Sequence, residues 1–336
     1  MRIGIVGTGF MGSTHAAAWA ATNARIAGFV TRDEVTGSVL AAQYQAQIYP
    51  DLPSMLADVD VVDICTPTHL HEEMVLSAAS AKKHILCEKP LARTLTQAQN
   101  MLTAVAEAGV KLMVAHVVRF FPEYAQAKAQ VEAGAIGKPA VLRLTRGTFQ
   151  PKKAADNWFV EFEKSGGMML DLMIHDLDYA RWVAGDVATV FAKNISSSFA
   201  GVTVDHGLAI LTHRSGAISH VEGSWAYPPP LFRTRFEIAG DNGWLQYSSE
   251  EMSAIKLHLR PEQDEEIPDV PLPGSPLSED PYTTEIKAFY DCLVKDTAVP
   301  VNGADGLAAL QIALAAIESA QTGQPIHLQP FPEALP

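Results

Sequence analysis

The chain has 336 residues, 48% of them hydrophobic and 19% charged, which is typical of a globular protein with an ample core and about two domains. Its net charge of −13, from 25 basic and 38 acidic residues, argues against a nucleic-acid-binding surface. No apolar run approaches the ~20 residues that span a bilayer, so no membrane partner is expected. Cys65, Cys87 and Cys292 have no metal-ligand spacing, so we expect no metal site and predict a reducing, cytoplasmic location.

The chain opens with a strand-like segment, Arg2–Val6, then Gly7-Thr8-Gly9-Phe10-Met11-Gly12 and a predicted helix over Ser13–Ala21. Glycine at the first position allows a tight turn, at the second a close approach to a pyrophosphate, and at the third close packing of helix on strand. The pyrophosphate would lie at the helix N-terminus, where free N–H groups favour an anion. The motif therefore predicts a dinucleotide site, with an ordinary glycine-rich turn as the alternative.

The second predicted strand, Ile26–Val30, ends at the position that decides between NAD and NADP. NAD-specific domains place an acid there for the ribose hydroxyls, and this chain has Thr31 instead. Arg32 could meet a 2′-phosphate, whereas Asp33 follows slightly late but could still reach a ribose. The sequence therefore predicts NAD or NADP, with a lean to NADP.

Strand and helix signals alternate through residues 1–120, which predicts a doubly wound parallel sheet of the Rossmann type. Thr66, Pro67 and His69 follow one buried strand and are expected on a loop above the cofactor. The further predicted elements are helices over Val35–Tyr44, Glu72–Ala81 and Thr96–Ala108, and strands over Gln47–Tyr49, Val61–Cys65, His84–Cys87 and Lys111–Ala115.

Residues 121–336 are predicted to form an α+β domain with a large, mostly antiparallel open sheet, because strands come in series with few helices. Residues 261–281, with six prolines and seven acids, are predicted to be an exposed connection. The predicted helices are Glu123–Ala133, Gly167–Ala184, Thr283–Lys295 and Ala304–Thr322, and the predicted strands are Ala140–Phe149, Val187–Ser197, Val204–His213, Ala217–Ala226, Phe232–Ala239, Trp244–Tyr247 and Ile255–Leu259.

Glu88-Lys89-Pro90 follows the strand His84–Cys87, at the carboxyl end where open α/β sheets present their chemistry. The proline fixes the local backbone and so helps to position the lysine. Glu88 could bind a ribose or pair with a cation. A surface lysine at the start of a loop is the alternative for Lys89.

Asp171 and His175 are four residues apart on the predicted helix Gly167–Ala184, so both side chains should leave one face. An acid and an imidazole interrupt an otherwise apolar helix, and such groups need partners or a cavity. A buried structural Asp–His pair is the alternative reading.

Oxidation of a secondary alcohol by a nicotinamide needs a base for the hydroxyl proton and a cation for the developing alkoxide. His175 suits the base, because its ordinary pKa is near neutrality, and Lys89 suits the cation. Asp171 would bind a substrate hydroxyl or orient the other two. Lys89 is the alternative base if desolvation lowers its pKa.

The chain resembles the Gfo/Idh/MocA family of nicotinamide-dependent oxidoreductases, which includes inositol and sugar dehydrogenases. The resemblance covers nearly the whole length and is carried by Gly7–Gly12, Thr66-Pro67 with His69, Glu88-Lys89-Pro90, Arg119-Phe120 and Gly166-Gly167…Asp171…His175-Asp176. It implies that Lys89, Asp171 and His175 are catalytic, and that Glu88 and Arg119 help to bind the cofactor. It also implies a homodimer or homotetramer formed through the second-domain sheet.

The expected substrate is a cyclitol or sugar, oxidised at a CH–OH group. Lys89, Asp171 and His175 would contact it, Trp158 could stack on its C–H face, and Tyr282 could reach the site. Two other functions remain open: redox-neutral chemistry such as glycoside cleavage with a retained nicotinamide, and a nucleotide-sensing regulator without catalysis.

Overall fold

The computed structural model describes residues 1–152, 157–199, 202–250 and 280–330. The chain divides into two compact units. The first contains residues 1–120 and 280–307, and the second contains the described parts of 121–250 and 308–330. Residues 280–307, which the sequence analysis assigned to the second domain, thus belong to the first unit. The predicted strand Ile255–Leu259 and residues 261–279 lie outside the described residues.

The first unit is built on a six-stranded sheet in the order β3-β2-β1-β4-β5-β6, with every neighbouring pair parallel. The order reverses between β1 and β4, and open α/β sheets bind ligands at this switch point. The predicted parallel sheet is confirmed. Its strands are β1 Arg2–Val6, β2 Arg25–Val30, β3 Gln47–Tyr49, β4 Val61–Ile64, β5 His84–Glu88 and β6 Leu112–Ala115.

Several helices of the first unit begin or end at residues with recognisable capping chemistry. Asp33 caps α2, Thr94 and Gln97 form a capping box at α5, and Gly109 ends α5 with φ 66°. The described helices are α1 Phe10–Ala20, α2 Glu34–Tyr44, α3 Leu52–Met55, α4 His71–Ser80, α5 Leu95–Ala108 and α10 Pro281–Lys295, with 3-10 turns η1 Leu56–Asp58, η2 Thr68–Leu70 and η3 Val117–Phe120.

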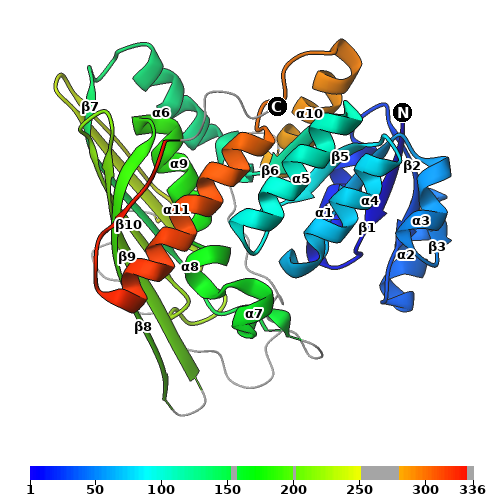
Figure 1. The fold of residues 1–336 in the computed structure, drawn as a ribbon, viewed down its shortest axis with the longest axis horizontal. Helices are drawn as coiled ribbons and strands as arrows, with labels where there is room; N and C mark the ends of the chain where they lie inside the picture. The colour runs from blue at the N-terminus through cyan, green and yellow to red at the C-terminus, as the bar shows by residue number, and fades with distance from the viewer. Residues whose placement is uncertain (153–156, 200–201, 251–279, 331–336) are drawn as a thin grey trace. The chain divides into compact units, whose positions relative to one another are not determined.

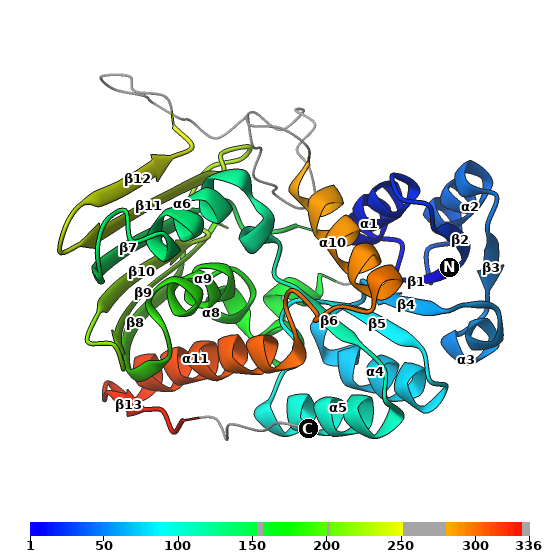
Figure 2. The same cartoon turned by 90° about the horizontal axis from the view of Figure 1, so that it is seen from above.

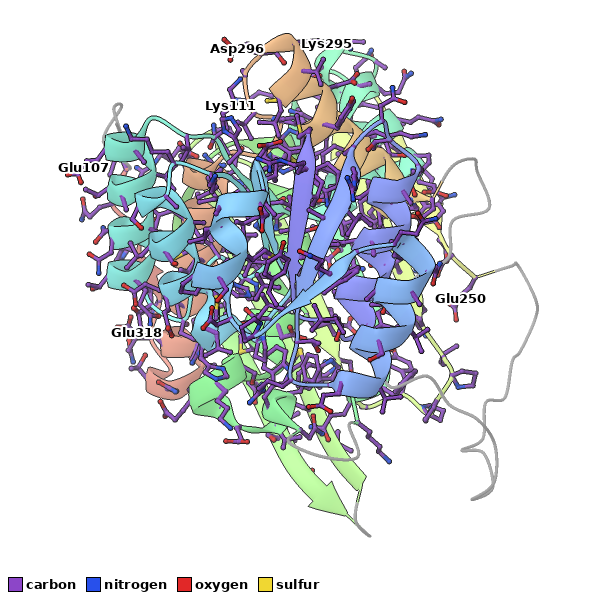
Figure 3. The ribbon with its side chains drawn as sticks, turned by 90° about the vertical axis from the view of Figure 1, so that its right-hand side faces the viewer. Glu107, Lys111, Glu250, Lys295, Asp296 and Glu318 are labelled. Atoms are coloured by element: carbon purple, nitrogen blue, oxygen red, sulfur yellow. The ribbon has the colours of Figure 1, made fainter. Side chains whose placement is uncertain are left out.

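Helix α10 completes the core of the first unit, although it lies far along the chain. Its residues Ile286 and Phe289 are fully buried in the same cluster as Trp19 of α1. Asp296 and Thr297 follow directly after the helix, and both contact Lys111 (Figure 3). Lys111 Nζ lies 2.7 Å from the Asp296 carboxylate and donates to the Thr297 carbonyl at 2.7 Å. The end of α10 is therefore tied to the start of β6.

The second unit is built on a seven-stranded sheet in the order β12-β11-β7-β10-β9-β8-β13. Only β7 and β10 run parallel; the other pairs are antiparallel, as predicted. Helices α6, α8, α9 and α11 lie on one face of this sheet (Figures 1 and 2). The elements are α6 Pro122–Glu132, β7 Pro139–Gly147, η4 Trp158–Val160, α7 Phe162–Ser165, α8 Gly167–Asp171, α9 Ile174–Ala184, β8 Val187–Phe199, β9 Val202–His213, β10 Ile218–Ser224, β11 Arg233–Gly240, β12 Trp244–Ser248, α11 Gly303–Thr322 and β13 Ile326–His327.

The single helix predicted over Gly167–Ala184 is wrong, because the structure breaks it at Leu172 and Met173. The N–H groups of both residues bond to the Met168 carbonyl, at 2.9 and 3.2 Å, which widens the turn. Asp171 is therefore the last residue of α8, and His175 lies in the first turn of α9. The two residues therefore lie in two helices separated by one turn, and not in one continuous helix as their spacing suggested.

Within the described ranges, no helix is both long enough and apolar enough to cross a bilayer.

Candidate active site

The glycine turn after β1 has no room for other residues. Gly7 has φ +96°, and a Cβ there would lie 2.6 Å from the Cys65 carbonyl oxygen. A Cβ on Gly12 would lie 1.9 Å from the Gly7 carbonyl oxygen. These contacts bring the start of α1, the end of β1 and the end of β4 together at the switch point.

The N-terminus of α1 has the features of an anion site. Gly9 is the N-cap, and no side chain bonds to the first N–H groups of the helix. Gly9 is exposed, and Phe10 and Met11 are half-buried. A pyrophosphate would satisfy those N–H groups and the helix dipole, so the residues present fit a dinucleotide.

The end of β2 is held by local hydrogen bonds. The hydroxyl groups of Thr8 and Thr31 are in contact, and Thr31 Oγ1 accepts the Asp33 N–H at 3.0 Å. The Asp33 carboxylate caps α2 by accepting from the N–H groups of Val35 and Thr36 and from the Thr36 hydroxyl. These bonds, led by the Thr36 hydroxyl, lower the pKa of Asp33. Asp33 is therefore engaged at the helix, while Arg32 is exposed.

The loop after β4 contains Thr66 and Pro67, and His69 lies in the following turn η2. His71 connects this loop to the next one. Its Nδ1 lies 2.9 Å from the Pro90 carbonyl oxygen, and its Nε2 lies 2.9 Å from the Thr66 carbonyl oxygen. The loops after β4 and β5 are thus joined through one buried imidazole.

Strand β5 delivers Glu88 and Lys89 to the carboxyl edge of the sheet. Glu88 is buried, and its Oε2 accepts the Lys89 backbone N–H at 3.0 Å. The Lys89–Pro90 peptide bond is cis, and Lys89 itself is half-buried. On the neighbouring strand, the chain continues into η3, where the buried Arg119 lies 3.3 Å from Asp305 Oδ2.

In the second unit, Asp171 and His175 lie on either side of the α8–α9 turn. Asp171 is buried and His175 is half-buried. Two glycines in left-handed conformations, Gly166 at φ 80° and Gly167 at φ 72°, start α8. The turn thus places an acid and an imidazole close together in the chain, within mostly apolar surroundings.

The α8–α9 turn packs on a glycine notch in the sheet. Gly207 of β9 and Gly223 of β10 are register partners, and Met173 lies directly over both. A Cβ on Gly223 would be 2.3 Å from the Met173 side chain, and one on Gly207 would be 2.9 Å from the Met173 sulfur. The notch therefore fixes how closely the turn approaches the sheet.

A buried ion pair anchors the first turn of α9, next to His175. Arg146 of β7 donates to Asp176 at 2.6 Å through Nε and at 3.2 Å through a second nitrogen. Asp176 is fully buried and Arg146 nearly so. An acid in the first turn also suits the helix dipole. Sequence reasoning missed this pair. The available signal was a charged residue in each of two largely apolar elements, β7 and α9.

The two aromatic candidates have different settings. Trp158 is half-buried in η4 and stacks on Phe159 with ring centroids 4.1 Å apart. Tyr282 is buried in the first turn of α10, in the first unit. The substrate contacts expected for both stay predictions.

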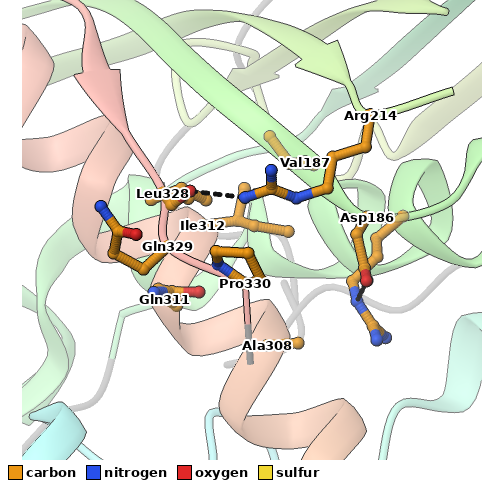
Figure 4. A pocket seen from close by; sticks show the side chains of 10 residues that line it. Asp186, Val187, Arg214, Ala308, Gln311, Ile312, Leu328, Gln329 and Pro330 are labelled. Carbon is orange, nitrogen blue, oxygen red and sulfur yellow. Dashed lines mark hydrogen bonds and ion pairs between the residues drawn. The ribbon is translucent and has the colours of Figure 1, made fainter. Parts of the chain in front are cut away.

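Two hollows in the second unit lie apart from Asp171 and His175. One is bordered by the start of α8 and by β8, β9 and α11, including Gly167, Met169 and Asp205. The other lies beside the end of the described chain, where Arg214 donates to the Leu328 carbonyl at 2.6 Å (Figure 4). Neither includes Asp171 or His175 among its lining residues.

Comparison with known proteins agrees with this architecture. Residues 1–116 match the family described as "Oxidoreductase family, NAD-binding Rossmann fold", and residues 124–246 match the "GFO/IDH/MocA C-terminal domain". The "Uncharacterized oxidoreductase YrbE" of Bacillus subtilis is 32% identical over 81% of this chain and 79% of its own. The "Myo-inositol 2-dehydrogenase" of Thermotoga maritima is 29% identical over 98% of this chain and 99% of its own. The solved structure described as "Levoglucosan dehydrogenase, complex with NADH and L-sorbose" has a TM-score of 0.82 at 25% identity, covering 98% of this chain and 99% of that one.

The first unit has a Rossmann sheet whose glycine turn leads into an uncapped helix. Together with the family matches of both units, this identifies the chain as an NAD(P)-dependent oxidoreductase. The chain belongs to the Gfo/Idh/MocA family.

Proposed function

We propose that this protein is a dehydrogenase that transfers a hydride between a secondary alcohol of a cyclitol or sugar and NAD(P). The observation that carries the proposal is the position of Lys89 directly after the carboxyl end of β5, on the same edge of the sheet as the glycine turn. Asp171 and His175, on the α8–α9 turn of the second unit, are proposed to complete a catalytic trio with it. The inositol and levoglucosan dehydrogenases named above support the substrate class.

The trio supplies the two functions that alcohol oxidation needs. The Lys89 ammonium holds the substrate hydroxyl and stabilises the developing alkoxide. Asp171 accepts a hydrogen bond from a substrate hydroxyl or orients the other two groups. A nicotinamide, when bound, accepts the hydride; Gly7–Gly12, Glu88 and Arg119 are the residues proposed to hold the dinucleotide, with Thr66, Pro67 and His69 above it. Trp158 and Tyr282 are proposed to contact the substrate.

The proton acceptor is His175 or Lys89. If His175 is the base, kcat/KM rises with pH through the pKa of an imidazole, and His175→Asn removes that rise. If Lys89 is the base, the rise persists in His175→Asn and disappears in Lys89→Met. The pH–rate profiles of the two variants therefore separate the assignments.

The test is nicotinamide reduction by the purified protein, with NAD and NADP separately, against inositols, aldoses and sugar acids. We expect turnover with at least one cyclitol or sugar, and a loss of about 10²-fold or more in kcat for Lys89→Met. The matched control is Lys138→Met, which changes an exposed lysine of the second unit and should leave kcat unchanged.

Two results would contradict the proposal. Tight retention of a nicotinamide through many turnovers without net reduction would indicate redox-neutral chemistry. Dinucleotide binding without turnover of any substrate, and with no effect of Lys89→Met on affinity, would indicate a sensor.

The expected preference for NADP over NAD rests on two residues. Arg32 could bind a 2′-phosphate, and the Asp33 carboxylate is already hydrogen-bonded to the start of α2. Arg32→Ala should lower kcat/KM for NADP by about tenfold and leave that for NAD nearly unchanged. Equal losses with both cofactors, or a wild-type preference for NAD, would show that Arg32 does not read a 2′-phosphate.

One face of the second unit's sheet has no described helix over it, and this uncovered face supports assembly into a homodimer or homotetramer. Four large apolar side chains on β8, β9 and β10 are exposed on this face: Ile195 at 59%, Leu208 at 43%, Ile210 at 38% and Ile218 at 41%. Clustered apolar residues of this kind mark association surfaces. The cytoplasmic location stays a prediction.

A further inference from the structure

Three titratable side chains from separate elements meet beneath the cofactor edge of the first unit. His15 of α1 and Asp63 of β4 are 0% exposed, and Glu88 of β5 is 7% exposed. Burial of charged groups is costly unless they are paired and hydrogen-bonded.

Asp63 is an acceptor in this cluster. His15 Nδ1 lies 3.1 and 3.0 Å from its two oxygens, and the Trp19 indole N–H donates to it at 2.8 Å. Because an indole nitrogen can only donate, and the Cys65 thiol also lies 3.4 Å away as a donor, the carboxylate is surrounded by donors. The geometry therefore places a proton on His15 Nδ1.

The opposite nitrogen of the same ring faces Glu88. His15 Nε2 lies 3.1 Å from Glu88 Oε1, while Glu88 Oε2 accepts the Lys89 backbone N–H. His15 Nε2 makes no hydrogen bond with any described residue, so its contact with Glu88 is an ion-pair contact and not a hydrogen bond. Hydrogen bonds join His15 to Asp63 and Glu88 to the backbone of Lys89, and an imidazolium between them would donate to Asp63 and attract Glu88.

The charges around the ring support that state. Burial disfavours the imidazolium and is the largest single effect, but the attraction and hydrogen bonding of Asp63 and Cys65 together outweigh it, so the pKa of His15 is raised well above its usual value. Burial raises the pKa of the Cys65 thiol, which stays protonated, and likewise raises the pKa of Glu285 on α10. Asp63 and Glu88 are the two carboxyl groups that lie against the His15 ring.

We propose that His15 is a positioning residue, an imidazolium that attracts Glu88 and fixes it in place so that Glu88 can bind the cofactor and hold the start of the Lys89 loop. The inference rests on the proposed function in one respect, the contact of Glu88 with the dinucleotide. It assigns a role to a helix residue that does not itself reach the cofactor edge.

The first test is equilibrium binding of NADH and of NADPH, followed by nicotinamide fluorescence at neutral pH. In His15→Asn, Glu88 is left beside Asp63 without a cation to hold it. We expect affinity about tenfold weaker than wild type at neutral pH. Glu88→Gln should also weaken binding.

The double variant decides whether His15 acts through Glu88. If it does, His15→Asn with Glu88→Gln binds no more weakly than Glu88→Gln alone. Additive losses would overturn the proposal. The matched control is His213→Asn, which removes a buried histidine of the second unit that bonds to Gly185 and Ser219. It should lower the melting temperature without changing affinity.

A second measurement is independent of cofactor binding. In ¹⁵N NMR spectra of the ligand-free protein at pH 7, both ring nitrogens of His15 should carry protons, and Glu88→Gln should lower the pH at which one is lost. A neutral ring at pH 7 would overturn the inference even if the dinucleotide binds. Failure of the wild type to bind either dinucleotide, with the imidazolium present, would instead contradict the proposed function.

Discussion

Single residues of the first unit set how closely its backbone segments approach and which buried groups carry charge. The glycine turn brings the ends of β1 and β4 within van der Waals contact, and His15 and Asp63 lie directly below it. Sequence reasoning identified the glycines, because their spacing is a local pattern. It missed the His15–Asp63 pair, for which the available signal was a histidine and an aspartate inside apolar elements 48 residues apart.

Substitution of Gly12 tests the turn. In Gly12→Ala the new Cβ would lie 1.9 Å from a backbone oxygen, so the turn must open. We expect the free energy of unfolding to fall by about 1–3 kcal/mol and NADH binding to be lost. The control is Gly134→Ala: Gly134, unlike Gly12, has a positive φ, but no atom lies within 4 Å of its Cβ position. Normal NADH affinity in Gly12→Ala would contradict the assignment of this turn.

The buried carboxyl group of Glu285 predicts how the free energy of unfolding depends on pH. Burial raises the folded-state pKa of this carboxyl well above its usual value, and neither oxygen has a hydrogen-bond partner among the described residues. The unfolded chain releases the proton first, so rising pH favours unfolding until the folded-state pKa is reached. Glu285→Gln should therefore gain stability relative to wild type as pH rises from about 5 to 8, by up to about 1.4 kcal/mol per pH unit. Urea unfolding at several pH values measures this, and a constant difference would contradict it.

At the scale of elements, most helices and strands were predicted within one or two residues, because hydrophobic periodicity and capping residues are local signals. The short elements α3, α7 and β13 were not predicted, and two larger features were also missed. The break at Leu172–Met173 has no glycine or proline to announce it, and Met173 at the break lies over Gly207 and Gly223 on distant strands. The membership of α10 in the first unit depends on which core its apolar face meets, which an amphipathic pattern cannot specify.

The glycine notch predicts a coupling between the sheet and the α8–α9 turn. Gly223→Ala places a Cβ 2.3 Å from the Met173 side chain and should displace the turn that carries Asp171 and His175. We expect a loss of about 1–3 kcal/mol in stability together with a lower kcat. Met173→Ala in the same chain restores room and should recover part of kcat; no recovery would mean that the notch does not set the position of the turn.

At the scale of the whole molecule, the uncovered sheet face predicts an oligomer. Ile210 of β9 lies between Phe191 and His220 in the register of the sheet and is 38% exposed. Ile210→Glu should raise the dissociation constant of the assembly by about tenfold or more, measured by light scattering with size-exclusion chromatography. Val35→Glu, at an exposed position of α2 in the first unit, is the control. A wild-type protein that is monomeric at micromolar concentration would contradict the prediction.

The late return of the chain to the first unit has a consequence for biosynthesis. Ile286 and Phe289 fill the core beside Trp19, yet the ribosome synthesises them more than 260 residues after it. The nucleotide-binding unit therefore cannot finish folding as it emerges, and it waits with an apolar surface uncovered while the second unit is made. A nascent chain arrested before residue 280 should remain bound to chaperones, and release should follow once α10 has left the exit tunnel.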